Sequence, residues 1–156
     1  MKRVIGLVFL FCHLSFVTAF AQIGTWKHYL AYHDIQSICK ADKDLFVLAS
    51  NDLYQYNLDD QSIITYDKVN GLSDSYITLI AWNQQAKRLI IVYKNSNIDL
   101  IDIDGNVINI SSLYTKSTTD DKTITSISME GVYAYLTTPS MILKLNMQKA
   151  EISETL

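Results

Sequence analysis

The chain of 156 residues is poor in residues that break or cross-link a backbone. It has one proline, five glycines and two cysteines, whereas 49% of its residues are hydrophobic and 19% are charged. This balance excludes a disordered or low-complexity protein. Cys12 lies inside an N-terminal apolar run, so Cys39 has no intrachain disulfide partner once that run is removed. We therefore expect one globular domain whose core no disulfide supports.

Positive charge is also scarce. The net charge is −3, and removal of residues 1–21, which contain Lys2 and Arg3 and no acid, changes it to −5. The remaining lysines and arginines form no basic stripe along the sequence. Binding to phosphates needs clustered basic side chains, so nucleic acid is not an expected partner.

The N-terminus has the pattern of a secretory signal peptide. Two basic residues precede an apolar run over 4–17, and Ala19 and Ala21 occupy the −3 and −1 positions of a cleavage site before Gln22. The alternative, an uncleaved membrane anchor, would need a longer apolar run. We predict that residues 1–21 are a Sec signal peptide and that the mature protein is exported, to the periplasm or the outer-membrane cell surface.

Motifs that carry enzyme chemistry are absent from the sequence. There is no G-x-S-x-G, Ser-His-Asp spacing, glycine-rich phosphate loop or zinc-ligand spacing. A calcium loop around Asp102 and Asp104 would need an oxygen ligand two residues before Asp102, where Leu100 stands. His28 and His33 are five residues apart and would point to opposite faces of a strand. We predict no catalytic residue, cofactor or metal site, and no enzymatic activity.

A repeat of short apolar runs separated by Asn, Asp, Gly and Ser fills the rest of the chain. Three units align, and the tightest match is Asn57 with Asp102 and Asn146, at offsets of 45 and 44 residues. In the second unit, Asp104-Gly105 is a pair typical of a two-residue hairpin. The predicted strands are 35–38, 45–49, 53–57 and 62–66 in the first unit, 77–80, 89–93, 98–102 and 107–110 in the second, and 124–127, 132–137, 141–146 and 150–154 in the third.

Four strands in 40 to 47 residues is the size of one β-propeller blade. The sequence therefore predicts an all-β fold in which 22–156 is a partial N-terminal propeller with four-stranded antiparallel blades at about 34–67, 76–111 and 123–156. Propellers need at least four blades, so we expect an incomplete ring that needs further blades of the same or another chain. A predicted strand at 26–32 is a candidate closing strand. The alternatives are an open three-blade stack and a small sandwich.

Aromatic residues are the candidate ligand contacts. The chain has ten tyrosines and two tryptophans, and aromatic faces can stack on the apolar faces of sugars. Most of these residues lie in predicted strands, where tyrosine is a preferred residue for packing alone. Those near predicted strand ends, where a propeller places its binding loops, are Tyr29, Tyr32, Tyr76 and Trp82.

The segment 69–77, Val-Asn-Gly-Leu-Ser-Asp-Ser-Tyr-Ile, resembles the Gly-Leu-Ser signature of two-component-regulator propeller repeats, which occur in exported Bacteroidetes proteins. Segments 24–33, 53–56, 65–73 and 91–101 resemble, in order and spacing, the N-terminal β-propeller of PorZ-like proteins of the type IX secretion system. This resemblance covers essentially the whole mature chain.

The resemblance implies a protein with two β-propellers and a C-terminal sorting domain in the surface attachment complex. It also implies binding of anionic lipopolysaccharide and its presentation to the sortase, with other secretion-system proteins as partners. It assigns none of these contacts to particular residues. A second hypothesis is the periplasmic sensor propeller of a hybrid two-component regulator, although the Leu-Trp-Ile-Gly-Thr strand of those repeats is absent at 45–49 and 89–93. A propeller hydrolase or lyase is the third.

Overall fold

The computed structural model describes residues 33–156, which form three β-sheets and one short helix. The predicted signal peptide, the predicted strand at 26–32, Tyr29 and Tyr32 lie outside these residues. Blade 1 contains β1 (Ile35–Ala41), β2 (Asp44–Ala49), β3 (Asp52–Asn57) and β4 (Ile63–Tyr66). Blade 2 contains β5 (Ile77–Asn83), β6 (Arg88–Tyr93), β7 (Ile98–Asp102) and β8 (Val107–Ile110). Blade 3 contains β9 (Ser126–Glu130), β10 (Tyr133–Thr137), β11 (Ile142–Asn146) and β12 (Glu151–Thr155).

Each sheet is built from four strands that follow one another in the chain, and every neighbouring pair is antiparallel. The helix α2 (Ser112–Thr115) lies in the connection between blades 2 and 3 and buries Leu113. The predicted all-β fold of three four-stranded blades is confirmed. Within residues 33–156, no helix is long and apolar enough to cross a membrane.

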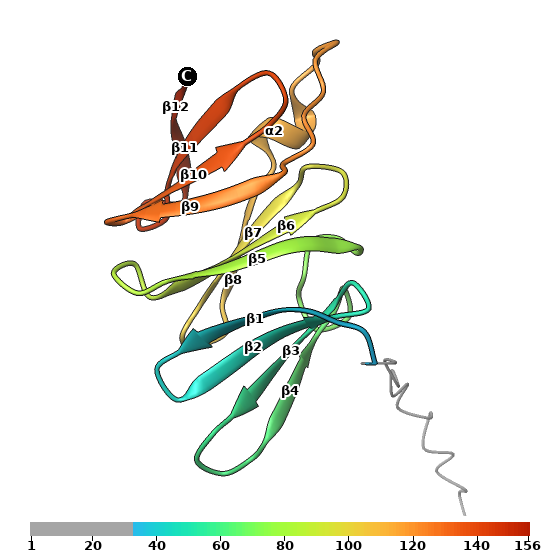
Figure 1. Ribbon diagram of the computed structural model, residues 1–156, viewed down its shortest axis with the longest axis vertical. Helices are drawn as coiled ribbons and strands as arrows, with labels where there is room; N and C mark the ends of the chain where they lie inside the picture. Colours follow the sequence, from blue (N-terminus) through green and yellow to red (C-terminus); the bar gives the residue numbers. More distant parts are fainter. Residues whose placement is uncertain (1–32) are drawn as a thin grey trace, which may run out of the picture.

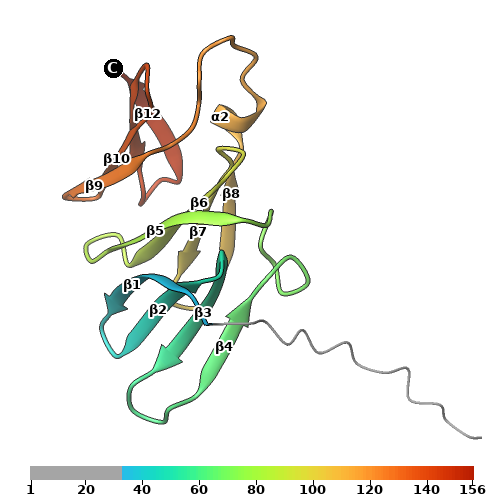
Figure 2. The ribbon, with the colours of Figure 1, turned by 45° about the vertical axis from the view of Figure 1, so that its right-hand side comes forward.

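The three blades are stacked in chain order, with blade 2 between blades 1 and 3, in both views of the ribbon (Figure 1, Figure 2). The first strands are neighbours across the stack: β5 contacts β1 on one side and β9 on the other. Figure 2 shows the later strands of blades 1 and 3 diverging from this line. The first strand of each blade therefore lies innermost, as expected for blades arranged around an axis.

Blade 2 buries both of its faces, because the residues of β6 alternate between two hydrophobic clusters. Leu89, Ile91 and Tyr93 belong to the cluster shared with blade 1, and Ile90 and Val92 to the cluster shared with blade 3. A strand covered on both faces needs a continuous apolar run, which these five residues provide. On the neighbouring blades the clusters contain Ala41, Phe46, Leu48, Leu53 and Tyr66 of blade 1, and Ala134, Leu136, Leu143, Leu145 and Met147 of blade 3.

The best-matched repeat position closes the last hairpin of every blade. Asn57, Asp102 and Asn146 end the third strands, and each side-chain Oδ1 accepts two backbone N–H bonds from the turn that follows. Such Asx turns hold a hairpin without needing a particular residue inside it. The N–H donors are those of Asp59 and Asp60, of Asp104 and Asn106, and of Gln148 and Lys149.

Two local predictions are wrong. The hairpin of blade 2 is not a two-residue turn: Asp102 and Asn106 bond to each other, and three residues lie between them. Gly105 takes a positive φ of 84°, which suits a three-residue loop ending in a left-handed residue. In blade 3, β9 begins at Ser126 rather than at Ile124, because Ile124 is buried in the second cluster before the strand pairing starts.

Candidate functional site

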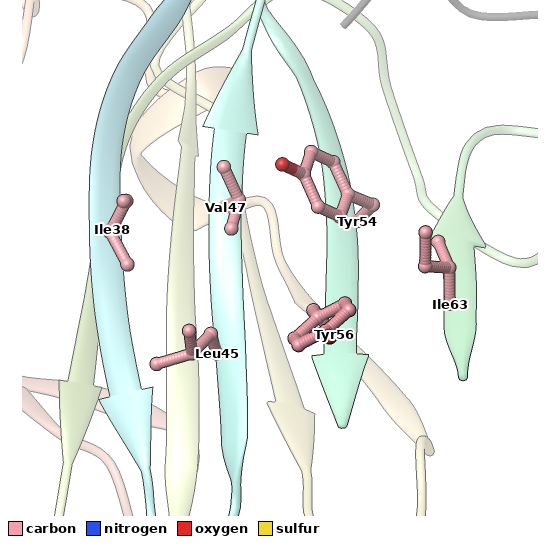
Figure 3. Close-up of a pocket in the computed structure, with 6 residues that line it drawn as sticks. All are labelled: Ile38, Leu45, Val47, Tyr54, Tyr56 and Ile63. Carbon is pink, nitrogen blue, oxygen red and sulfur yellow. The ribbon is translucent and has the colours of Figure 1, made fainter. Parts of the chain in front are cut away.

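The face of blade 1 that points away from blade 2 is an apolar surface. It forms a shallow hollow of about 460 Å³. Figure 3 shows its side chains projecting from all four strands of the blade. Two of them, Ile38 and Ile63, are 55% and 59% exposed. We call this surface the open face of blade 1; its residues are Ile38, Leu45, Val47, Tyr54, Tyr56 and Ile63.

The strand register explains why this face is apolar. Leu45 and Val47 pair with β3 at the same places as Leu89 and Ile91 pair with β7 in blade 2. Leu89 and Ile91 are fully buried against blade 1. The open face of blade 1 therefore carries apolar residues at the positions that, in blade 2, pack against the preceding blade. The signal that could have predicted this surface is the alignment of β2 with β6, in which apolar residues occupy both faces of each strand.

The outward face of blade 3 is different, because it carries charged and phenolic side chains. The Lys144 ammonium lies 3.4 Å from a Glu154 carboxylate oxygen and 4.8 Å from the centre of the Tyr133 ring. The hydrogen bond from Lys144 to Glu154 raises the pKa of Lys144. The pKa of Tyr135 is raised, mainly by desolvation and to a smaller extent by a hydrogen bond with Glu130. The two end faces of the stack therefore offer different chemistry to a neighbour.

The Gly-Leu-Ser loop that joins blades 1 and 2 is held rigidly. Gly71 has a φ of 108°, a value that favours glycine, and Leu72 is buried in the first cluster. The backbone N–H of Ser73 donates to Asp99 at 2.8 Å. Asp99 is fully buried and also accepts from Tyr93 Oη at 2.6 Å and from Asn109 at 2.8 Å. A buried carboxylate with three donors fixes this loop on the edge of blade 2.

Of the four aromatic residues proposed as ligand contacts, Tyr76 and Trp82 fall in the described part. Trp82 packs against the first cluster with its ring stacked on Phe46 at 5.9 Å, and its indole N–H donates to Gln84. Tyr76 is 67% exposed and has a positive φ of 61°, at the end of the Gly-Leu-Ser loop. The structure thus separates the two residues: Trp82 packs in the protein, and Tyr76 faces solvent.

The acidic residues that suggested a calcium loop have other partners. Asp99 is buried beneath the Gly-Leu-Ser loop, and Asp102 holds the turn of blade 2. Within residues 33–156, no group of three or more His, Cys, Asp or Glu side chains is close enough to hold a metal ion. Burial raises the pKa of the Cys39 thiol, whose sulfur lies 3.5 Å from the carbonyl oxygen of Ile80. This describes a packed thiol rather than an activated one.

Comparison with known proteins assigns the fold to a family. Residues 45–156 match the family described as the N-terminal beta-propeller domain of PorZ of the type IX secretion system. This chain belongs to that family. The predicted resemblance to PorZ-like propellers is confirmed.

Among solved structures, PorZ of Porphyromonas gingivalis superposes with a TM-score of 0.78 and 31% sequence identity, over 85% of this chain and 18% of that one. Its published description is an essential bacterial surface component of the type IX secretion system. The chain thus spans less than a fifth of that PorZ. Among curated proteins, no match was found.

Two other solved structures share only the fold with this chain. The extracellular domain of the hybrid two-component system BT4673 from B. thetaiotaomicron has a TM-score of 0.62 and 17% identity, over 78% of this chain and 16% of that one. AztD from Citrobacter koseri has a TM-score of 0.57 and 13% identity, over 79% of this chain and 34% of that one. Identity this low shows a shared fold and says nothing about function.

Proposed function

We propose that this chain forms the first blades of the N-terminal propeller in a PorZ-like component of the type IX secretion system. Its role there is that of a non-enzymatic binding and scaffold module. The observation that carries the proposal is the 31% identity to PorZ of P. gingivalis over 85% of the chain. That PorZ is described as a surface component, which supports export of this chain by a signal peptide at residues 1–21, to the periplasm or the cell surface.

The open face of blade 1 is the scaffold surface that this proposal needs. We infer that another blade, from the same or another chain, covers it and extends the ring. Support comes from the two interfaces already present, in which each blade offers Leu, Ile, Val or Ala side chains to the blade before it. Burial of such side chains contributes about 25 cal/mol per Å² of apolar area, so a covered face is the more stable arrangement.

The ligand in this proposal is anionic lipopolysaccharide, which the complete protein would present to the sortase. The support for ligand and sortase is the family resemblance. A pull-down of the complete protein with purified anionic lipopolysaccharide tests the ligand, with an unrelated secreted propeller as the control. We expect retention above that control. Retention at the level of the control would refute lipopolysaccharide binding without affecting the assignment to the family.

The second candidate function is the sensor propeller of a hybrid two-component regulator, favoured by the fold shared with BT4673. The reading frame beyond residue 156 separates the two. A secretion component is expected to continue into more propeller and a sorting domain. A sensor would continue into a transmembrane helix and a kinase, and that result would refute the secretion proposal.

A further inference from the structure

A second, polar hollow lies where blades 1 and 2 meet, on the side of the stack where the chain crosses from one blade to the next. It has a volume of about 290 Å³. The turn between β2 and β3 forms one wall, and the end of the Gly-Leu-Ser loop forms the other. Figure 1 shows this turn on the right, below the start of β5. The lining residues are Ser50, Asn51, Asp52, Ser75 and Tyr76.

The two walls are joined by hydrogen bonds, so the hollow is formed before any ligand arrives. The side-chain amide of Asn51 donates to the carbonyl of Ile77 at 3.0 Å, and the N–H of Ile77 donates back to the carbonyl of Asn51 at 3.0 Å. On the far side, Lys94 N–H donates to the carbonyl of Tyr76 at 3.0 Å. A preorganised site loses less entropy when it binds a ligand.

Tyr76 has an unusual backbone for an aromatic residue. Its φ of 61° lies in the left-handed region, which a side chain with a Cβ adopts at a cost, yet its ring is 67% exposed and belongs to neither hydrophobic cluster. Strained residues of this kind cluster at binding sites, where the surrounding structure holds them in place. The ring of Tyr76 is in neither of the aromatic pairs present within residues 33–156.

The lining groups are matched to a ligand rich in hydroxyl groups. Among the residues that the structure describes, no hydrogen-bond partner is present for the hydroxyls of Ser50, Ser75 and Tyr76. Each hydroxyl can donate and accept, and the carbonyl oxygen of the Asn51 side chain adds an acceptor. A phenol ring beside such groups presents a flat apolar surface next to polar contacts, which is the pairing that a pyranose ring needs.

The charge of the described lining residues favours a neutral ligand over an anionic one. Among the lining residues that the structure describes, Asp52 contributes a carboxylate and there is no lysine or arginine. A phosphate or carboxylate at this position would lie beside a carboxylate and would find no cationic side chain among these lining residues. We propose that this hollow is a binding site for a neutral saccharide, with the sugar ring stacked on Tyr76 and its hydroxyls bonded to Ser50, Asn51 and Ser75. The site differs in ligand charge from lipopolysaccharide binding and does not depend on it.

Saturation-transfer NMR on the complete protein tests this proposal. The probes are methyl β-D-glucopyranoside, methyl β-D-galactopyranoside and N-acetyl-D-glucosamine, with D-glucuronic acid and D-glucose 1-phosphate as anionic counterparts. We expect transfer to the ring C–H protons of at least one neutral probe and less to either anion. The Tyr76→Ala variant should weaken binding about five- to tenfold, the range expected for loss of one aromatic contact, and Tyr76→Phe should retain it.

Tyr114→Ala is the matched control, because Tyr114 is also exposed, at 47%, and lies in α2 away from the hollow. We expect it to bind like the unaltered protein, and a thermal melt of each variant checks that folding is unchanged. Absence of transfer to every neutral probe would overturn the proposal. So would unchanged binding by Tyr76→Ala, or stronger binding of the anions. Binding of short peptides in competition with the sugars would assign the hollow to a protein partner instead.

Discussion

Two isoleucines at the same repeat position test whether the open face of blade 1 is covered in the complete protein. Ile38 pairs with Val47, and Ile80 pairs with Ile91, at equivalent places in the register of the two blades. Ile80 is 7% exposed because it packs toward blade 1, whereas Ile38 is 55% exposed on the open face. A further blade over that face would give Ile38 the surroundings that Ile80 has now.

The expected costs follow from these exposed fractions. Truncation of a buried isoleucine to alanine lowers the free energy of unfolding by about 2–5 kcal/mol, so we expect about 3 kcal/mol for Ile80→Ala in any context. Within residues 33–156, the side chain of Ile38 is only partly buried, since it is 55% exposed. Ile38→Ala should therefore cost about 1 kcal/mol in a chain of residues 22–156. In the complete protein, with the face covered, it should also cost about 3 kcal/mol.

Urea unfolding of both variants, in the chain of residues 22–156 and in the complete protein, measures this difference. Ile103→Ala is the control, since Ile103 is 57% exposed in the turn of blade 2 and should cost under about 1 kcal/mol in both contexts. A cost of about 1 kcal/mol for Ile38→Ala in the complete protein would refute the covered face. A cost of about 3 kcal/mol for Ile38→Ala in the chain of residues 22–156 would indicate that two copies associate through this face. Analytical ultracentrifugation would detect such a dimer.

Three further outcomes are expected. Tyr93→Phe removes a phenol that donates to the Asp99 carboxylate at 2.6 Å, and should cost about 2 kcal/mol in urea unfolding at neutral pH. Burial and this hydrogen bond raise the pKa of Tyr93 in the folded protein, so the unfolded chain loses the phenol proton at a lower pH. The free energy of unfolding should therefore fall as the pH rises above about 10, the ordinary pKa of tyrosine. The fall should be less steep in Tyr93→Phe. Asn146→Ala leaves two turn N–H groups without their acceptor and should lower the free energy of unfolding by about 1 kcal/mol, whereas Asp104→Ala, which keeps the Asp102 turn acceptor, should change it by less. Finally, N-terminal sequencing of the exported protein should begin at Gln22.

The repeat could be predicted from the sequence because each strand carries its own signal. The continuous apolar run at 89–93 marks a strand of the second unit, and the aligned Asn57, Asp102 and Asn146 mark the last turn of every unit. The loop length after Asp102 could not be predicted, since the Asp-Gly pair suits a two-residue turn as well as the observed three-residue loop. That choice depends on which backbone groups pair across the hairpin.

The candidate sites were harder to predict, because exposure depends on neighbouring blades. Trp82 and Tyr76 have the same aromatic character and lie near the two ends of one strand, yet Trp82 stacks on Phe46 and Tyr76 is exposed. Nothing in the sequence around Tyr76 indicates its positive φ, since Ser75 and Ile77 are ordinary flanking residues. The hollow beside it brings together residues about 25 positions apart, which only the packing of two blades places side by side.

The consecutive order of strands in each sheet has a consequence for biogenesis. Within residues 33–156, every strand pairs with a strand next to it in the chain, so each of these blades can pair its strands as soon as its own residues have emerged. Blade 1 would then be in place when blade 2 arrives, and would supply the apolar surface on which β6 packs. We expect an exported chain of this kind to fold progressively from its N-terminus during translocation. The open face of blade 1 would then be the last apolar surface to be covered.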